Sequence, residues 1–265
     1  MKRWIPFMKS DPEVAVVRLS GMISASGRGT LNDASLAPLI DKAFSRGKPA
    51  AVALQINSPG GSPVQSSLIG ARIRRMAEEK NVPVFAFVED VAASGGYWLA
   101  SAADEIFADD SSVVGSVGVI SASFGAHELL ARYGVERRVY TAGRSKSMLD
   151  PFRPEQPEDV ERLKRLLEDI HTNFKEHVTR RRGARLAEGR DLFTGEVWLG
   201  RSAVELGLID GIGHMKPVLR DRFGDKVRFR SYGARKSLLS RLGAQMMDDA
   251  LQSVEERSAF AQYGL

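Results

Sequence analysis

The stretch that most constrains the fold of this chain is an apolar run that ends in a turn of small residues. Residues 83–88 are continuously apolar, residues 92–96 are alanine, serine and glycine only, and residues 97–103 favour a helix. This order predicts a buried strand, a sharp turn and a helix. Ser94 would then lie at a helix N-terminus, where unpaired backbone N–H groups and the positive end of the helix dipole face it. The turn therefore predicts a nucleophilic serine.

The same pattern occurs once more, earlier in the chain. Residues 50–56 form a continuous apolar run, residues 57–62 carry the turn Asn-Ser-Pro-Gly-Gly-Ser, and apolar positions from Leu68 to Met76 have a helical period. A first strand over residues 14–19 and a helix over residues 33–44 precede them. Continuous apolar runs are typical of strands in a parallel sheet that is covered on both faces. We therefore expect an α/β fold with right-handed crossovers.

The second half of the chain predicts shorter strands and one long helix. Residues 105–108, 117–120 and 139–141 are strand candidates, and residues 126–133 favour a short helix with a polar face. After three prolines, apolar residues at helical spacing predict a helix of about twenty residues that begins near Glu158.

No linker or internal repeat divides the chain. We expect an N-terminal segment over residues 1–12, one domain over residues 13–233 and an amphipathic helical tail over residues 234–265. The tail is expected to pack on the body or on a sister subunit. Its Ala259-Phe260-Ala261 pattern resembles the residues before a signal-peptide cleavage point, so self-processing stays an open alternative.

Composition excludes several classes of protein. The 43% of hydrophobic residues in a chain of 265 suffices for a buried core. The absence of cysteine excludes disulfides, thiol catalysis and cysteine metal sites. The four histidines show no metal-ligand spacing, so we expect neither a metal nor another cofactor.

The charge pattern does not point to a specific nucleic-acid partner. The net charge is only +5, and the densest basic cluster, residues 179–185, fits a solvated helix end, with nucleic-acid or anionic-lipid contact as the alternatives. The N-terminal apolar stretch is interrupted by Pro6 and ends at Lys9, too short for a signal peptide, and no apolar run is long enough to span a bilayer. We expect a soluble chain, cytoplasmic or peripheral to a membrane. The residues suited to touching a membrane surface are Lys2, Arg3, Trp4 and Phe7.

The two glycine turns predict an oxyanion site. Both follow parallel strands, and ligand sites of open α/β sheets gather at the carboxyl ends of the strands. Because glycine has no Cβ, backbone N–H groups of Gly60-Gly61 and of Gly95 can approach a ligand closely. One N–H from each turn would make a two-donor oxyanion hole. Taken singly, either glycine pair could instead be only a tight turn.

The serine also needs a base, and the sequence offers two candidates. His127 lies in the short polar-faced helix and favours a surface position. Lys146 lies in a Gly/Ser-rich loop with apolar neighbours that make burial credible. A lysine base must be neutral, so burial would have to lower its pKa from about 10.4 to near neutrality. Ser116 could orient the neutral amine, and Asp150 is expected to point away from it.

Taken together, these segments resemble the S49 peptidases, the signal peptide peptidase A family. The resemblance runs from about residue 14 to residue 213 with the motifs in the family's order. The segments that carry it are residues 57–61 (NSPGG), 92–97 (AASGGY), 115–120 (GSVGVI), 146–152 (KSMLDPF), 194–198 (TGEVW) and 206–210 (LGLID).

The resemblance implies a serine endopeptidase with a Ser/Lys dyad on a Clp/crotonase-like fold of stacked β–β–α units. Ser94 would attack the scissile carbonyl, and Lys146 would take its proton and pass it to the leaving amine. Ser116 would hold the lysine, and Gly61 with Gly95 would form the oxyanion hole. Apolar peptides such as remnant signal peptides are the implied substrates.

The resemblance also implies a ring-shaped homo-oligomer in which serine and lysine meet across a subunit boundary, so that a monomer is inactive. The chain departs from the family in two respects. It shows no transmembrane anchor, and Trp98 and Arg144 stand beside the catalytic positions, where they can change the size of the pocket.

Two other functions stay open. A crotonase-like acyl-CoA hydrolase or lyase would also use two backbone N–H groups, but it needs a catalytic carboxylate and leaves Ser94 and Lys146 without roles. An inactive scaffold that binds peptides or membrane partners would not need these two residues either.

Overall fold

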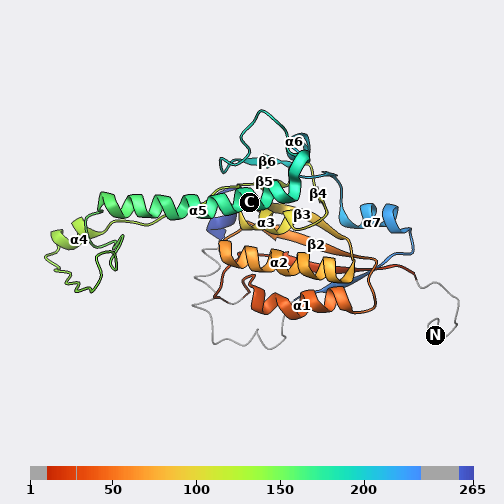
Figure 1. Ribbon diagram of the computed structural model, residues 1–265, viewed down its shortest axis with the longest axis horizontal. Coiled ribbons are helices and arrows are strands. Elements are labelled where there is room, and N and C mark those ends of the chain that lie inside the picture. The colour runs from red at the N-terminus through yellow and green to blue at the C-terminus, as the bar shows by residue number, and fades with distance from the viewer. Residues whose placement is uncertain (1–10, 28, 234–256) are drawn as a thin grey trace.

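The computed structural model describes residues 11–27, 29–233 and 257–265, and a twisted sheet lies at its centre (Figure 1). The strand order is β6-β5-β3-β2-β1-β8, and β4 connects β3 to β7. All pairings are parallel except that of β5 with β6. The strands are β1 (Glu13–Ser20), β2 (Ala51–Ser58), β3 (Val84–Ala93), β4 (Glu105–Ala108), β5 (Val113–Gly115), β6 (Val197–Leu199), β7 (Gly211–Ile212) and β8 (Arg228–Tyr232).

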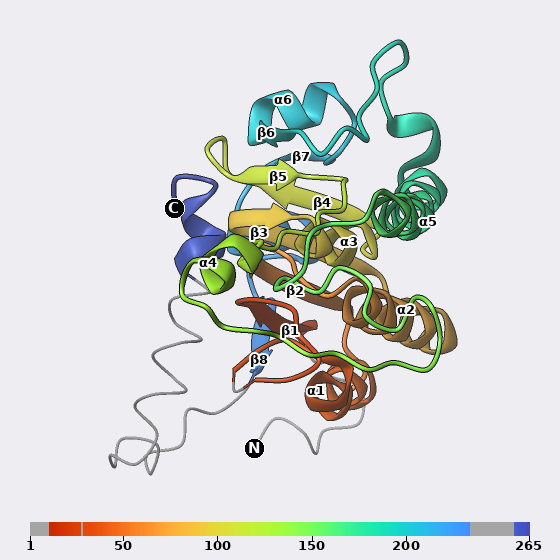
Figure 2. The ribbon, with the colours of Figure 1, turned by 90° about the vertical axis from the view of Figure 1, so that its left-hand side faces the viewer.

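Helices cover the sheet, which explains why its central strands are apolar throughout. Helices α1, α2, α3 and α5 lie on one side, and the C-terminal turn of residues 257–261 lies on the other (Figure 2). On that second side, α7 packs on Val14, Val16, Phe85 and Phe87. The helices are α1 (Asp33–Ser45), α2 (Pro63–Lys80), α3 (Gly95–Ser101), α4 (His127–Arg132), α5 (Pro157–Arg182), α6 (Gly200–Glu205) and α7 (Met215–Phe223), with a 3₁₀ turn at Gly183–Arg185.

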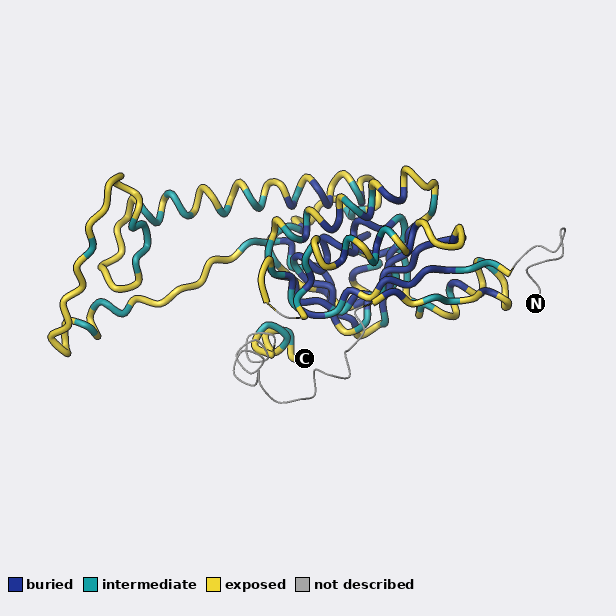
Figure 3. The backbone as a smooth tube through the Cα atoms, turned by 90° about the horizontal axis from the view of Figure 1, so that it is seen from below, coloured by how far each residue is buried: buried dark blue, intermediate teal, exposed yellow. Residues whose placement is uncertain are grey.

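An arm projects from this body. It consists of residues 118–156, with α4 near its tip, and it is joined to the body by the outer half of α5 (Figure 1). The arm is largely exposed, in contrast to the buried strands of the body (Figure 3). Within the arm, Arg137 Nε donates to Asp150 Oδ2 at 3.0 Å, and its guanidinium lies 5.0 Å from the centre of the Phe152 ring. Its large exposed apolar side chains are Ile120, Phe124, Leu129, Tyr133, Val135, Tyr140 and Phe152.

The inner half of α5 is anchored in the body. Phe174 and Val178 enter the hydrophobic core. Arg182 is buried, and its Nη1 donates to Asp210 Oδ2 at 2.7 Å while its Nε donates to the carbonyl oxygen of Gly207 at 2.9 Å. One end of the helix is thus fixed to the sheet while the other carries the arm.

The strands and helices expected in the first half of the chain are confirmed, and so are the strand at residues 105–108, the short helix α4 and the long helix, which runs for 26 residues. Two expected strands are wrong. Residues 117–120 form no strand. Val113–Gly115 forms β5 instead, because Val113–Gly115 pairs with both β3 and β6. Residues 139–141 lie in the arm, where Tyr140 is 91% exposed and no partner strand within the described chain pairs with them.

Parts of two expectations fall outside the described residues. These are the residues expected to suit contact with a membrane, Lys2, Arg3, Trp4 and Phe7, and residues 234–256, which make up most of the expected helical tail. The last described segment does contain a helical turn at residues 257–261. Across the described ranges, no helix has the length and apolar character needed to cross a bilayer.

Candidate active site

Ser94 stands at the junction of β3 and α3 in a backbone conformation that L-residues rarely adopt. It is the N-cap of α3, with φ +51° and ψ −122°. The turn is fixed at both ends, since the Ser94 N–H donates to the carbonyl oxygen of Gly115 at 2.9 Å and the Trp98 N–H donates to the carbonyl oxygen of Ser94 at 3.0 Å. A positive φ at a non-glycine residue costs of order 1–3 kcal/mol and is concentrated at functional sites. The surrounding hydrogen bonds hold Ser94 in this strained position.

The two glycine turns meet at Ser94. A Cβ on Gly60 would lie 2.7 Å from the Gly95 nitrogen and 2.8 Å from Ser94 Cβ, and a Cβ on Gly61 would lie 2.1 Å from the carbonyl oxygen of Ile23. Both positions therefore require glycine. Among the described residues, neither the Gly61 N–H nor the Gly95 N–H donates to a protein acceptor. Two N–H donors are thus available beside the serine hydroxyl.

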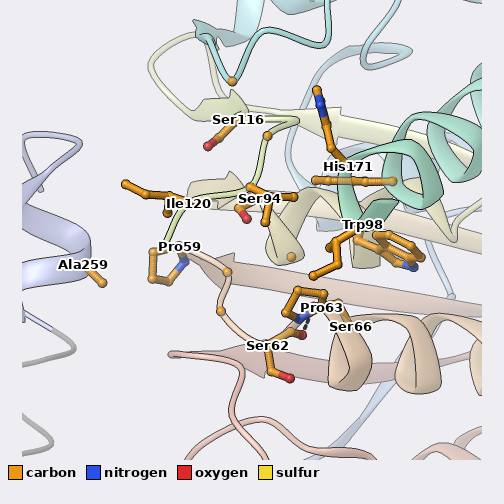
Figure 4. A pocket seen from close by; sticks show the side chains of 18 of the residues that line it. Pro59, Ser62, Pro63, Ser66, Ser94, Trp98, Ser116, Ile120, His171 and Ala259 are labelled. Atoms are coloured by element: carbon orange, nitrogen blue, oxygen red, sulfur yellow. Dashed lines mark hydrogen bonds between the residues drawn. The ribbon is translucent and has the colours of Figure 1, made fainter. Parts of the chain in front are cut away.

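These residues line a single cavity of about 900 Å³. The cavity brings together Ser94, Gly61, Gly95 and Ser116, four of the five residues predicted for the site. Figure 4 shows the Ser94 side chain between Ser116 above and Ser62, Pro63 and Ser66 below. Ser116 is itself held at φ +52° by its N–H, which donates to the carbonyl oxygen of Glu196 at 2.8 Å.

The fifth predicted residue is not brought to this cavity within one chain. Lys146 lies on the arm, away from the body, and is exposed, so the expected burial of its amine is not found in the single chain. His127, the alternative base, lies on α4 of the same arm. Asp150 is engaged inside the arm: the Phe152 N–H and then Arg137 hold the pKa of its carboxyl below the usual range. Arg144 is also exposed on the arm.

The sequence analysis expected Trp98 to influence the size of the pocket, and the structure places Trp98 in the pocket wall. His171 and Phe174 also line the pocket but were not predicted for the site. His171, the next residue after the apolar Ile170, has its Nε2 atom 3.2 Å from the carbonyl oxygen of Val117. The interval of four residues between Ser94 and Trp98 was the available signal, because it places both on one face of a helix.

The C-terminal segment borders the same cavity. Ala259, Gln262 and Tyr263 contribute to its lining, and Tyr263 Oη lies 3.5 Å from Ser116 Oγ. The aromatic rings of Phe260 and Tyr263 pack on a small apolar cluster behind the serine turn, formed by Val91, Ala93 and Val113. Among the described residues, no group of three or more histidine, aspartate and glutamate side chains could hold a metal ion.

Comparison with known proteins shows the family to which this chain belongs. The model of peptidase family S49 matches residues 76–222, which is more than half of the chain. The chain belongs to peptidase family S49. The α/β fold is accordingly the Clp/crotonase-like fold that the sequence motifs implied.

Several relatives share long alignments with this S49 chain. It is 49% identical over 286 aligned residues to a Brucella abortus (strain 2308) protein named Na(+)/H(+) antiporter NhaA, an alignment that covers 100% of this chain and 39% of that protein. It is 30% identical to the chloroplastic serine protease SPPA of Arabidopsis thaliana over 80% of this chain and 32% of that protein. The chain thus spans two fifths or less of the length of these relatives.

A further relative and a solved structure extend the comparison. Protease 4 of Haemophilus influenzae (strain ATCC 51907 / DSM 11121 / KW20 / Rd) is 30% identical over 76% of this S49 chain and 33% of its own length. A mutant of the 1510-N membrane-bound stomatin-specific protease aligns with 86% of this chain and all of its own, with 13% identity and a TM-score of 0.47.

Proposed function

We propose that this chain is a serine endopeptidase in which Ser94 is the nucleophile and Lys146 the general base. The observation that carries the proposal is the convergence at one cavity of a strained serine with two unpaired backbone N–H groups, those of Gly61 and Gly95. Such donors act on charge that develops in the transition state, and each is worth about 3–4 kcal/mol. Membership of a peptidase family supports the same assignment.

The proposed chemistry is acyl transfer in two steps. Ser94 Oγ attacks the peptide carbonyl while its proton passes to the neutral Lys146 amine, and the Gly61 and Gly95 N–H groups stabilise the resulting oxyanion. The tetrahedral intermediate then expels the amine of the second product, which takes the proton from Lys146 as the C–N bond breaks. A water molecule releases the acyl group by the reverse sequence, with Lys146 again accepting the proton.

We propose that Lys146 reaches Ser94 from a second copy of the chain. The arm carries Lys146 away from its own body and exposes large apolar side chains, with Phe124 87% and Tyr140 91% exposed. Large exposed apolar areas are typical of protein interfaces. A homo-oligomeric ring would cover them and place each arm at a neighbouring serine, where Ser116 is positioned to hold the amine.

Apolar peptides, of which remnant signal peptides are an example, fit this cavity best. Its walls include the apolar side chains of Met22, Pro59, Ile120, Ile170 and Phe174. Among the described residues that line it there is no aspartate or glutamate, so the catalytic carboxylate that an acyl-CoA hydrolase or lyase of the crotonase type needs is not supplied there. A purely peptide-binding scaffold would have no need for the strained conformation of Ser94.

The decisive experiment measures hydrolysis of an apolar peptide library by mass spectrometry. Ser94→Ala and Lys146→Ala should each lower kcat/KM by at least about 10⁴-fold, and both should leave the size of the assembly unchanged. Lys164→Ala, which removes an exposed lysine from α5, is the matched control and should retain activity.

The same experiment separates the proposed base from the histidine of the pocket. Loss of activity in His171→Gln combined with full activity in Lys146→Ala would overturn the Ser/Lys dyad and make His171 the base. If wild type and all variants are equally inert, the peptidase proposal itself is wrong and the scaffold function is favoured.

A further inference from the structure

The indole of Trp98 is held at the inner end of the cavity by three helices. Helix α3 places it one turn after Ser94. On α5, its ring stacks on His177 with centroids 4.4 Å apart and planes 10° apart, and it meets the ring of Phe174 at 5.0 Å. On α2, a Cβ added to Gly70 would lie 3.2 Å from Trp98 Cδ1, so a larger residue at this position would press on the indole. The indole therefore has a fixed position.

His177, which stacks on Trp98, has a structural role. His177 Nε2 lies 3.2 Å from the carbonyl oxygen of Trp98 and 3.0 Å from Ser101 Oγ, and both partners are on α3. Burial lowers the pKa of His177 to about 4, so its ring is neutral at physiological pH. A neutral ring with both contacts on α3 fixes the end of α3 that carries Trp98.

The cavity has an open side and a closed end. Pro59, Ile120 and Ala259 border the side away from Trp98 (Figure 4). At the other end, Ser66, Trp98 and Phe174 are 0%, 9% and 4% exposed. We therefore place an extended peptide backbone along the open side, so that one substrate side chain points toward the buried residues of the closed end.

The position of Ser94 determines which side chain enters the closed end. The carbonyl under attack must lie against Ser94 Oγ with its oxygen toward the N–H groups of Gly61 and Gly95. The side chain of the same residue is then the one nearest to Trp98, one helical turn from Ser94. Among the described residues, no charged aspartate, glutamate, lysine or arginine lines the cavity, so the closed end is suited to an apolar group.

We propose that Trp98 is the floor of the subsite for the residue whose carbonyl Ser94 attacks, and that it restricts this residue to small apolar side chains. The inference rests on the proposed function, because it assumes that Ser94 attacks a peptide. Trp98 is here a specificity-determining residue that takes no part in bond breaking. Removing methylene-sized groups from such a pocket changes selectivity by about 10–200-fold.

The test compares peptides that differ only at this residue, with alanine, leucine or phenylalanine. Wild type should cleave the alanine peptide with the highest kcat/KM. In Trp98→Leu the ratio of kcat/KM for the leucine or phenylalanine peptide over the alanine peptide should rise at least about tenfold, and Trp98→Phe should give a smaller rise. Trp98→Phe retains an aromatic ring against His177, so it decides the question if Trp98→Leu does not fold.

Control variants distinguish a failure of the Trp98 proposal from a failure of the catalytic proposal. Trp198→Phe alters a buried tryptophan outside the cavity and should leave the ratio unchanged. Peptide affinities measured in the Ser94→Ala background should show the same shift on adding Trp98→Leu, whether or not the chain hydrolyses peptides. A ratio unchanged in folded Trp98→Phe and Trp98→Leu, or wild type that accepts phenylalanine as well as alanine, would overturn the inference.

Discussion

At the scale of single residues, the site depends on residues whose neighbours hold them in one conformation. Ser94 keeps its positive φ because Gly115 and Trp98 bond to both sides of it, and Gly60 approaches it to a distance that no Cβ would permit. Burial lowers the pKa of His177, whose ring stacks on Trp98, because burial disfavours the charged form of the imidazole. Its environment has a consequence for stability that can be measured.

His177 should make the fold less stable in mild acid. Its pKa in the folded chain is about 4, while an unfolded histidine has a pKa of about 6.5. Between pH 4 and pH 6.5 the unfolded state therefore binds more protons than the folded state. The contribution of His177 to the free energy of unfolding is thus complete above about pH 6.5 and is lost as the pH falls toward 4. Over this window we expect a loss of about 3 kcal/mol.

Urea unfolding of wild type and His177→Gln at pH 7 and at pH 4.5 measures this effect. The variant should be less stable at pH 7, and its free energy of unfolding should fall less between the two pH values. A parallel fall in both proteins would show that other groups cause the acid sensitivity.

At this scale, the sequence pointed to site residues that lie within short motifs. Ser94, Gly61, Gly95 and Ser116 could be nominated because their motifs follow apolar runs and together resemble the S49 family. The structure brings the four residues to one cavity, and their catalytic roles stay predictions. The positions of Phe174 and His171 in the pocket wall could not be predicted, because they depend on how α3 and α5 pack against each other, and no local pattern encodes that contact.

At the scale of elements, α5 matters most because its two halves have different surroundings. The inner half is fixed by Phe174 and Val178 in the core and by the buried Arg182, whereas the outer half leads to the arm. Burial acts to raise the pKa of Asp210, but hydrogen bonds and positive charge from Arg182 outweigh it and keep that pKa below its ordinary value. This ion pair is the clearest polar link between the helix and the body.

Removing Arg182 should therefore destabilise the fold strongly. Arg182→Ala leaves Asp210 half-buried without its main partner and should cost about 3–5 kcal/mol in the free energy of unfolding. Arg180→Ala on an exposed position of the same helix should cost less than about 0.5 kcal/mol. Guanidinium unfolding curves of the two variants test this, and equal stabilities would contradict the anchoring role of Arg182.

Helices and strands were predicted well where the apolar pattern is long and clear, and poorly where strand formation depends on a neighbouring strand. The runs at residues 50–56 and 83–88 became β2 and β3 because helices cover them on one side and α7 with the C-terminal turn covers parts of the other. Residues 117–120 and 139–141 have comparable strand propensity but form no strand, since strand formation depends on cross-strand neighbours. The arm itself has no signature in the sequence beyond its prolines and glycines.

At the scale of the whole molecule, the separation of Lys146 from Ser94 is the dominant feature. In the proposed oligomer each site combines one body with another copy's arm. Mixing inactive Ser94→Ala and Lys146→Ala subunits should then restore activity, because some sites receive an intact serine and an intact lysine.

The recovered activity should reach about one quarter of the wild-type value for random mixing of equal amounts, provided that each site acts independently. This fraction follows from two independent choices between equally abundant subunits. Mixed assemblies, confirmed by mass spectrometry with isotope-labelled subunits, that remain inactive would favour a dyad within one chain.

The length of α5 has a consequence for how binding and turnover depend on concentration. Its 26 residues correspond to a rod of about 39 Å, with a wall of the proposed peptide subsite in the half held by the body and the lysine-bearing arm beyond the opposite end. The wall residue Phe174 belongs to the half that the body holds, so it stays in place in an isolated subunit. If the proposed oligomer forms the site, dilution should therefore abolish turnover before it weakens peptide affinity, and an isolated subunit would still bind the peptides that the proposed assembly cleaves.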